Sequence, residues 1–321
     1  MSKATKIWLV IASSLVLIGC ILFAGVMSTL RWDFTKLSNV KYETNDYEIN
    51  EDYKNISIVT DTADIVFALS ANAKSSIVCY EQKNAKHSVA IKDGTLVIEV
   101  EDTRKWYEYI GINFGTPKIT VYIPQGEYGT LSVKSSTGDV EIPKDFKFER
   151  IDISESTGDI TNCASASEVL KIKTSTGNIY VESISAGLLD LSVSTGKVTV
   201  SNVTCEGDIK INVSTGKTNI THVKCKDFTS SGSTGDISLK NFIVTEELSV
   251  ERTTGDVKFD GSDAAEIFVE TDTGNVRGSL LTDKVFVAQT DTGSVDVPKT
   301  ATGGRCEIST DTGDIKITIN D

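Results

Sequence analysis

Hydrophobic and polar residues alternate along most of the second half of the chain. Leu189, Leu191 and Val193 occupy every second position before a Thr-Gly pair. Val198 and Val200 continue the same alternation after it. A period of two places one set of side chains on a buried face and the other set in solvent. Each segment is therefore predicted to be a strand, and the Thr-Gly pair is predicted to be the turn between two strands.

The Thr-Gly turn recurs ten times, at intervals of 19 or 20 residues. The residue before Thr is Ser in six copies, and the residue after Gly is Asp, Asn, Lys or Ser. A degenerate copy, DTADIVF, begins at Asp61. Glycine adopts a positive φ without steric cost. We therefore expect structural turn glycines at Gly138, Gly158, Gly177, Gly196, Gly216, Gly235, Gly255, Gly274, Gly293 and Gly313.

Two architectures fit a strand–turn–strand unit of this length. A meander of hairpins would close into a barrel or a propeller, whereas a solenoid stacks one repeat per coil. Stacking rewards identical residues at equivalent positions, because they form ladders about 4.8 Å apart. Thr is present at the same position in all ten repeats. The sequence therefore predicts an all-β fold, a single-strand parallel β-solenoid of about ten 19–20-residue coils.

The chain divides into four predicted segments. Residues 1–28 form a cytoplasmic N-terminus and a transmembrane anchor, residues 29–50 a stalk, residues 51–130 an irregular β-rich N-terminal cap, and residues 131–321 the solenoid. The cap would cover unpaired strand edges at the first coil. An aromatic cluster in the cap is predicted to pack over that coil or to contact a sugar or lipid: Trp106, Tyr107, Tyr109 and Phe114. The last coil has no such cover, so we expect it to be a contact surface or to be protected by charge.

An uncharged run of 21 residues, 7–27, precedes the cap. As a helix it would span roughly 31 Å, close to the hydrocarbon thickness of a bilayer. Lys3 and Lys6 precede the run, which favours a cytoplasmic N-terminus and an extracellular C-terminal domain. Two alternatives are a cleaved signal peptide and a lipoprotein acylated at Cys20, since LIGC resembles a lipobox. All three place the folded part outside the cytoplasm.

The net charge of −13 argues against nucleic acid as a partner, because nucleic-acid-binding proteins present basic patches. The segment Asp291–Ser294 reads DTGS, the signature of aspartic proteases. Such a protease needs two of these loops on two lobes, so that two carboxylates share a proton. Here the segment is one member of a repeat, and seven of the ten copies have no Asp before Thr. We therefore interpret it as structural and predict no enzyme activity.

Three aspartates hold the same position in the last three repeats: Asp272, Asp291 and Asp311. In a solenoid their carboxylates would stack roughly 5 Å apart. Stacked anions repel one another, so a cation such as calcium is a candidate for this column. The alternative is a solvated column of turn residues. No other cofactor is predicted.

Cys205 and Cys225 also occupy equivalent positions in adjacent repeats. Their predicted separation suits either two buried thiols or a disulfide. The two histidines, His87 and His222, are isolated in the sequence, and no Cys–His spacing indicates a metal site.

Several segments resemble a bacterial family over about residues 50–321. They are ISIVTDTADIVF, DGTLVIEVE, the ITVYIP strand leading into LSVKSSTGDVEI, and the repeated Ser/Asp-Thr-Gly-Asp/Asn turns. The chain is similar here to the putative-adhesin family, also called domain of unknown function 4097. The resemblance implies an anchored solenoid at the cell envelope and offers no catalytic residues. Some relatives are associated with envelope stress responses.

The sequence thus predicts a non-enzymatic cell-envelope surface protein, an adhesin or a scaffold. Its expected partners are the membrane, through a single-pass anchor, and an envelope protein or a glycan. One alternative is an envelope-stress sensor or accessory subunit that acts through the membrane segment. The other is a polysaccharide-acting β-helix enzyme, which should show a cluster of acids, bases or arginines that breaks the repeat. The repeated Asp column is the one such cluster in the sequence.

Overall fold

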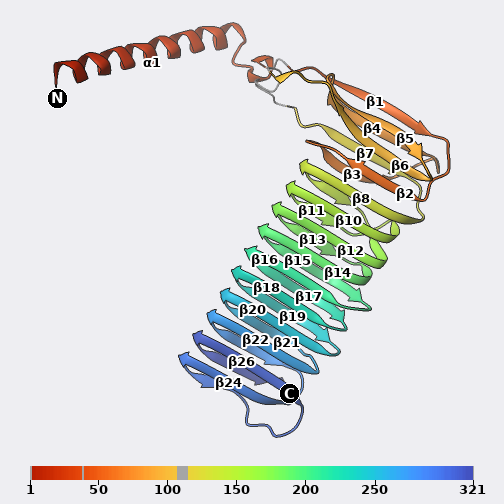
Figure 1. The fold of residues 1–321 in the computed structure, drawn as a ribbon, viewed down its shortest axis with the longest axis vertical. Helices are drawn as coiled ribbons and strands as arrows, with labels where there is room; N and C mark the ends of the chain where they lie inside the picture. The colour runs from red at the N-terminus through yellow and green to blue at the C-terminus, as the bar shows by residue number, and fades with distance from the viewer. Residues whose placement is uncertain (1, 38–39, 107–114, 321) are drawn as a thin grey trace.

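A computed structural model describes residues 2–37, 40–106 and 115–320. The chain begins with helix α1 (Lys3–Thr29) and a 3-10 turn, η1 (Phe34–Leu37). The rest is a long stack of strands, and α1 joins one end of it (Figure 1). By length and composition α1 can cross a membrane, and it buries none of its most apolar window inside the protein. The same properties also suit a secretion signal.

Each repeat contributes one strand to each of two parallel sheets. The strand before the glycine lies in sheet 1 and the strand after it lies in sheet 2. Sheet 1 contains β8 (Glu127–Thr137), β10 (Lys147–Thr157), β12 (Ser165–Thr176), β14 (Ser185–Thr195), β16 (Ile209–Thr215), β18 (Phe228–Thr234), β20 (Glu247–Thr254), β22 (Glu266–Thr273), β24 (Lys284–Thr292) and β26 (Gly304–Thr312). Sheet 2 contains β9 (Val140–Ile142), β11 (Ile160–Asn162), β13 (Ile179–Glu182), β15 (Val198–Cys205), β17 (Thr218–Cys225), β19 (Ile237–Val244), β21 (Val257–Ser262), β23 (Val276–Leu280), β25 (Val295–Asp296) and β27 (Ile315–Ile319).

The register of the sheets stacks equivalent residues on one another. Thr157 lies opposite Thr137 on one side and Thr176 on the other. Ile153 and Ile172 form one buried column in sheet 1, and the apolar residues of sheet 2 face them across the core. Each such buried side chain contributes about 1.5–3 kcal/mol. The predicted all-β parallel solenoid is therefore confirmed.

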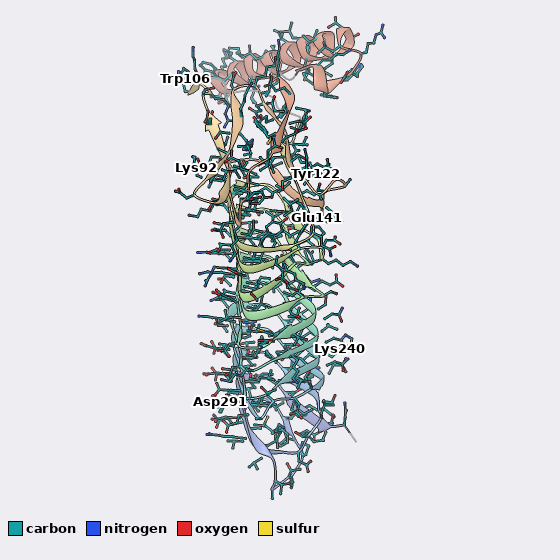
Figure 2. The ribbon with its side chains drawn as sticks, turned by 90° about the vertical axis from the view of Figure 1, so that its right-hand side faces the viewer. Lys92, Trp106, Tyr122, Glu141, Lys240 and Asp291 are labelled. Atoms are coloured by element: carbon teal, nitrogen blue, oxygen red, sulfur yellow. The ribbon has the colours of Figure 1, made fainter. Side chains whose placement is uncertain are left out.

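The outward side chains of the two sheets point to opposite sides of the rod. Figure 2 shows Lys92 and Asp291 on one side, and Tyr122, Glu141 and Lys240 on the other. Asp291 lies on β24 of sheet 1, and Glu141 and Lys240 lie on β9 and β19 of sheet 2. Lys92 and Tyr122 lie on strands that extend these two sheets toward α1.

Residues 51–130, which the sequence analysis assigned to an irregular cap, contain two further coils. β2 (Asn55–Val59) and β3 (Asp64–Leu69) pair in parallel with β8 and β9. β6 (Thr95–Asp102) and β7 (Lys118–Ile123) pair in parallel with β2 and β3 on the outer side. The degenerate copy at Asp61 is thus the corner of a coil. The later coil lies outside the earlier one, so the first coils are stacked out of chain order.

Antiparallel strands cover the end of the stack nearest to α1. β4 (Ser75–Gln82) pairs with β7, β5 (Ala85–Lys92) pairs with β6, and β1 (Tyr42–Ile49) pairs with β4. β1 lies in the segment that the sequence analysis assigned to a stalk. The sequence does not reveal this strand, because its composition is mixed and mostly polar. Of the predicted aromatic cluster, Tyr107, Tyr109 and Phe114 lie outside the residues that the structure describes. Trp106 is exposed.

The coil order is also inverted at the far end. β26 pairs with β22 on one side and with β24 on the other, and β27 lies between β23 and β25 in the same way. The coil of residues 304–319 is therefore inserted into the stack, and the coil of residues 284–296 forms the tip (Figure 1). The expectation that the last repeat in the sequence is the outermost coil is wrong, since consecutive repeats do not have to be neighbours.

Two glycines make this insertion possible. A Cβ on Gly303 would lie 1.8 Å from the carbonyl oxygen of Asp283, and one on Gly304 would lie 1.7 Å from that of Ala265. The start of β26 is thus held between the backbones of the coils on either side. Below it, Lys284 Nζ forms a buried ion pair with Asp263 Oδ1 at 2.6 Å, which joins the tip to the body of the rod.

A second corner column begins just after β13 and continues inside β15, β17, β19 and β21. Its members have a positive φ of 46–60° and recur every 19 or 20 residues: Ser183, Asn202, His222, Asn241 and Gly261. Asn, His and Gly tolerate this left-handed conformation better than most residues. His222, isolated in the sequence, therefore has a structural position, where its Nε2 lies 3.0 Å from Asn241 Nδ2.

Candidate binding surfaces

The ten repeat glycines form a continuous column along the corner between the sheets. Nine of them have a φ between 129° and 155°, and Gly274 lies outside that range. A Cβ on Gly216 would also lie 1.8 Å from the carbonyl oxygen of Gly196 in the adjacent coil. Glycine is required here for two reasons, its backbone conformation and the close approach of the neighbouring coil. The column brings successive corners close enough for the residues that follow to bond directly.

Those following residues form a hydrogen-bonded ladder on the outside of the corner. Asp159 Oδ1 accepts the backbone N–H of Asn178 at 2.8 Å, and Asn178 Oδ1 accepts that of Lys197 at 3.1 Å. The same contact joins six further pairs, written with the acceptor first: Asp64–Asp139, Asp139–Asp159, Asp236–Asp256, Asp256–Asn275, Asn275–Asp314 and Asp314–Ser294. The Asp and Asn residues of the repeat thus satisfy corner amides, as Asx side chains do in turns.

The ladder is interrupted in the middle of the rod by Lys197 and Lys217. A lysine side chain has no acceptor, so neither can continue the chain of bonds. Lys217 Nζ instead lies 2.9 Å from Asp236 Oδ2. This hydrogen bond lowers the pKa of the Asp236 carboxyl and raises the pKa of Lys217. The two stacked lysines are the basic side chains of a ladder whose acceptor side chains are carboxylates and amides.

The three aspartates proposed as a calcium column lie on the exposed side of the same corner. Because of the inverted coil, their order along the rod is Asp272, Asp311, Asp291. All three are exposed. Among the described residues, the three carboxylates do not form a group whose oxygens all lie within 4.8 Å of one another. The geometry therefore brings the residues into one column without closing a cation cage.

Cys205 and Cys225 occur as free, buried thiols. Cys205 Sγ contacts the carbonyl oxygens of Gly187 and Asp208 at 3.6 and 3.5 Å. Burial raises the pKa of Cys205 to about 11 and raises that of Cys225 as well. Both thiols belong to a column of inward side chains that begins with Tyr128 and Phe148, and they act there as small apolar residues.

The same column creates a groove along the side of the rod. Large side chains at Tyr128 and Phe148 are followed by Ala166 and Ala186 in the next coils, and the loss of volume hollows the surface. The groove has a volume of about 610 Å³ and is lined by Lys54, Glu127, Tyr128, Lys147, Phe148, Glu149, Ser165, Ala166, Ser167, Ser185, Ala186, Gly187 and Glu206. Its rim charges are largely paired, Lys54 with Glu149 at 2.6 Å and Lys147 with Glu127 at 3.6 Å.

A buried polar network lies at the end of the stack nearest to α1. His87 Nδ1 lies 2.7 Å from Glu81 Oε2, and His87 Nε2 lies 2.9 Å from Thr60 Oγ1. Asn45 donates to the second Glu81 oxygen at 2.6 Å, and Cys79 Sγ lies beside the group. The sequence analysis missed this network, because the hairpin of β4 and β5 joins residues of unremarkable spacing. One signal was available: Glu81 occupies the buried register of β4 together with Cys79.

The network has the bonding order of a hydroxyl–imidazole–carboxylate triad, but it is closed to substrate. Thr60, His87 and Glu81 are all buried, and none of them lines the groove. Every polar atom described above has a partner within the network. We therefore interpret it as a satisfied core contact between the β4–β5 hairpin and the coil of residues 55–69.

Two charged side chains in the solenoid core have no partner of opposite charge among the described residues. Arg252 is buried and donates to Ser230 Oγ at 2.8 Å, and burial lowers its pKa to about 10. Glu155 is buried and neither of its oxygens has a hydrogen-bond partner. Burial, together with the nearby carboxylate of Asp139, raises the pKa of Glu155 to about 8. Both belong to the same inward column, where most coils have Thr or Val.

Comparison with solved structures shows similar folds in bacterial proteins. A putative adhesin from Bacteroides fragilis is 18% identical, with 87% of this chain and 97% of that chain covered and a TM-score of 0.42. A putative lipid binding protein from Parabacteroides distasonis is 16% identical over 88% and 98% of the two chains, with a TM-score of 0.47. A putative cell adhesion protein from Clostridium sporogenes is 12% identical over 88% and 100%, with a TM-score of 0.23.

No curated protein matches the chain. A family model does match it, over residues 53–212 and 204–321. The matched residues include both out-of-order coils at the N-terminal end, the inserted coil of residues 304–319 and the tip coil of residues 284–296. The match covers the whole stack from β2 onward and agrees with the resemblance seen in the repeats. The chain therefore belongs to the Toastrack DUF4097 family.

Proposed function

We propose that the protein is a membrane-anchored, non-enzymatic binding protein of the cell envelope, whose solenoid lies outside the cytoplasm. One observation carries this proposal: a rod of stacked coils continues at one end into a 27-residue helix whose apolar side chains are exposed, with the exception of Met27. Such a surface requires a lipid environment. Lys3 and Lys6 before the helix favour a cytoplasmic N-terminus.

The groove on the side of the rod favours binding over catalysis as the function of this surface. Solenoids recognise partners through extended surfaces, and the groove along the first coils offers hydroxyls from three serines, small side chains and paired charges. These groups suit a glycan or an envelope protein. The buried Thr60–His87–Glu81 network has no opening to such a ligand.

The test is binding of the full-length chain, in lipid nanodiscs and fluorescently labelled, to intact bacterial cells and isolated envelopes. We expect saturable binding, measured with and without calcium. Ser167→Trp fills the groove at an exposed position and should weaken binding, whereas Thr229→Trp, exposed on a coil outside the groove, should not. Absence of saturable binding by the unsubstituted chain would remove the adhesive role and favour a sensor that works with a partner in its own membrane.

A further inference from the structure

The tip coil of residues 284–296 leaves both sheets open. Among the described residues, β24 pairs only with β26, and β25 pairs only with β27. In the two preceding coils, one interior position is occupied by Val276 and Ile315, both fully buried. At the tip the same position is occupied by Val295, which is 44% exposed. Phe286 and Ala288 are likewise only partly buried. The loop after β25 lies against this end, where Val297 packs partly buried on the core and Thr300 Oγ1 donates to the carbonyl oxygen of Lys284. The core of the solenoid therefore ends in a partly covered apolar cross-section.

The outer face of the tip also departs from the pattern of the other coils. Val287 is 48% exposed and Val285 is 41% exposed. In the preceding coil the positions of Val285 and Val287 are occupied by Arg305 and Glu307. Further along the rod the position of Val287 is occupied in turn by Phe268, Ser249, Thr229, Lys210, Asp190 and Lys171. At the tip, two outward positions that are charged in the preceding coil are therefore both apolar.

Among the residues that the structure describes, the edge strands at the opposite end differ in composition. They are β1, with the sequence YETNDYEI, and β5, with the sequence AKHSVAIK. Charged edge strands prevent further pairing. The same end also leads into α1. A head-to-tail contact, which would extend without limit, is therefore blocked at one of its two surfaces.

We propose that the tip binds the tip of a second copy of this chain. A two-fold axis perpendicular to the rod and to the sheets sets β24 antiparallel to its copy and β25 antiparallel to its copy, so that both sheets become continuous. Residues 285–290 read VFVAQT and have no charge. Along β24, such a contact allows two chains of net charge −13 to meet without placing like charges opposite one another. In β25 the carboxylate of Asp296 is paired with Lys316 Nζ at 3.4 Å within its own chain. The open cores then cover each other.

The consequence for adhesion rests on the proposed function, because it requires the anchor. With a membrane helix at one end and the self-binding tip at the other, a tip-to-tip pair has its two anchors at opposite ends. The contact therefore joins two membranes instead of two neighbours in one membrane. The partner is a second copy of this chain in another membrane, and the proposed activity is homophilic adhesion between cells.

The experiment uses the full-length chain with one copy per nanodisc, examined by mass photometry and electron microscopy. We expect particles with two discs joined by a rod of roughly 115 Å, twelve coils from each chain at about 4.8 Å per coil. Val287→Lys places two like charges near the two-fold axis and should raise the dissociation constant at least about tenfold. Thr229→Lys introduces the same charge at the equivalent position of a coil paired on both sides, and should leave the pair intact.

Three results would overturn the inference: particles with a single disc at all concentrations, two discs side by side at one end, or open-ended filaments. Equal loss of pairing in Thr229→Lys would also overturn it, because the effect would then come from charge alone. Circular dichroism of both variants checks that they fold. The outcome is separate from the proposed function: if Val287→Lys is monomeric and still binds foreign envelopes, the tip contact stands and a second binding surface exists. If the unsubstituted chain binds envelopes without pairing, only the tip inference fails.

Discussion

The backbone N–H of Asp314 donates to Asn275 Oδ1 at 3.0 Å, although the two residues lie in repeats that are not consecutive. The intervening repeat supplies Ser294, whose own N–H bonds to Asp314 Oδ1 at 2.9 Å on the other side. The hydrogen-bonded ladder along the corner therefore follows the order of coils in space, and it records the insertion of residues 304–319 between two earlier coils.

The coil order can be tested by disulfide trapping. Glu270 lies opposite Ser309, and Ser309 lies opposite Gln289. Adjacent strands are about 4.8 Å apart, which suits a disulfide, whereas strands two apart are about 9.6 Å apart and do not. We expect Glu270→Cys/Ser309→Cys to form a cross-link on mild oxidation, detected by peptide mass spectrometry. Glu270→Cys/Gln289→Cys is the matched control, and a cross-link in that pair alone would show that the coils follow the sequence.

Gly216→Ala should be strongly destabilising. The new Cβ would lie 1.8 Å from a backbone oxygen of the next coil, at a φ of 141°. The backbone strain alone costs about 1–3 kcal/mol, and the displacement of the neighbouring coil adds to it. Thermal unfolding followed by circular dichroism measures the change. Gly126→Ala is the control, since its Cβ would meet no atom closer than 3.8 Å. An equal effect of the two substitutions would contradict the role of the glycine column.

Lys197→Asn should stabilise the rod. An Asn side chain at this position supplies the acceptor that the ladder lacks, and the backbone N–H of Lys217 is its donor. One added hydrogen bond contributes about 0.5–1.5 kcal/mol. Chemical denaturation measures the gain, with Lys171→Asn on an outward strand position as the control. A loss of stability in Lys197→Asn would indicate that the lysine has another role at this corner.

Glu155 should make the protein less stable as the pH rises. Its pKa is raised to about 8 in the folded chain, so between about pH 4.5 and pH 8 the unfolded chain loses this proton while the folded chain keeps it. Stability from this group therefore declines across that window. Glu155→Thr, the residue of the next coil at Thr174, should flatten the pH dependence and add roughly 1–3 kcal/mol at high pH.

The control for Glu155 is Glu141→Thr, an exposed position on sheet 2 (Figure 2). Melting temperatures are compared from pH 5 to pH 9 for the three proteins. If the unsubstituted chain and Glu155→Thr differ by a constant amount at every pH, the carboxyl does not titrate differently in the folded state.

The sequence predicts the repeating part of the fold well and its ends poorly. Stacking imposes the same demand on every coil, so the Thr-Gly period, the alternation around Leu191 and the solenoid itself are visible in the residues. That uniformity also hides the coil order, because any two coils with equivalent residues can pair. The Gly303–Gly304 pair is a clue to the insertion, but its meaning depends on the backbones of Asp283 and Ala265 on either side.

The candidate surfaces divide in the same way. The columns that follow from the period, such as Asp272, Asp291 and Asp311, are found from the sequence, although not in their order. The groove depends on a change of volume between Phe148 and Ala166, whose adjacency only the register reveals. The buried network of His87 and Glu81 forms across a hairpin in the least repetitive part of the chain, where no period guides the assignment.

The inserted coil constrains the order in which a newly synthesised chain can reach its final fold. Residues 284–296 are made before residues 304–319, yet their partners in the finished fold, β26 and β27, belong to the later segment. The last two coils must therefore form together, after synthesis of both is complete. The tip is the final part of the molecule to mature, and a chain interrupted between Val297 and Gly304 would display an unfolded tail instead of a shorter rod.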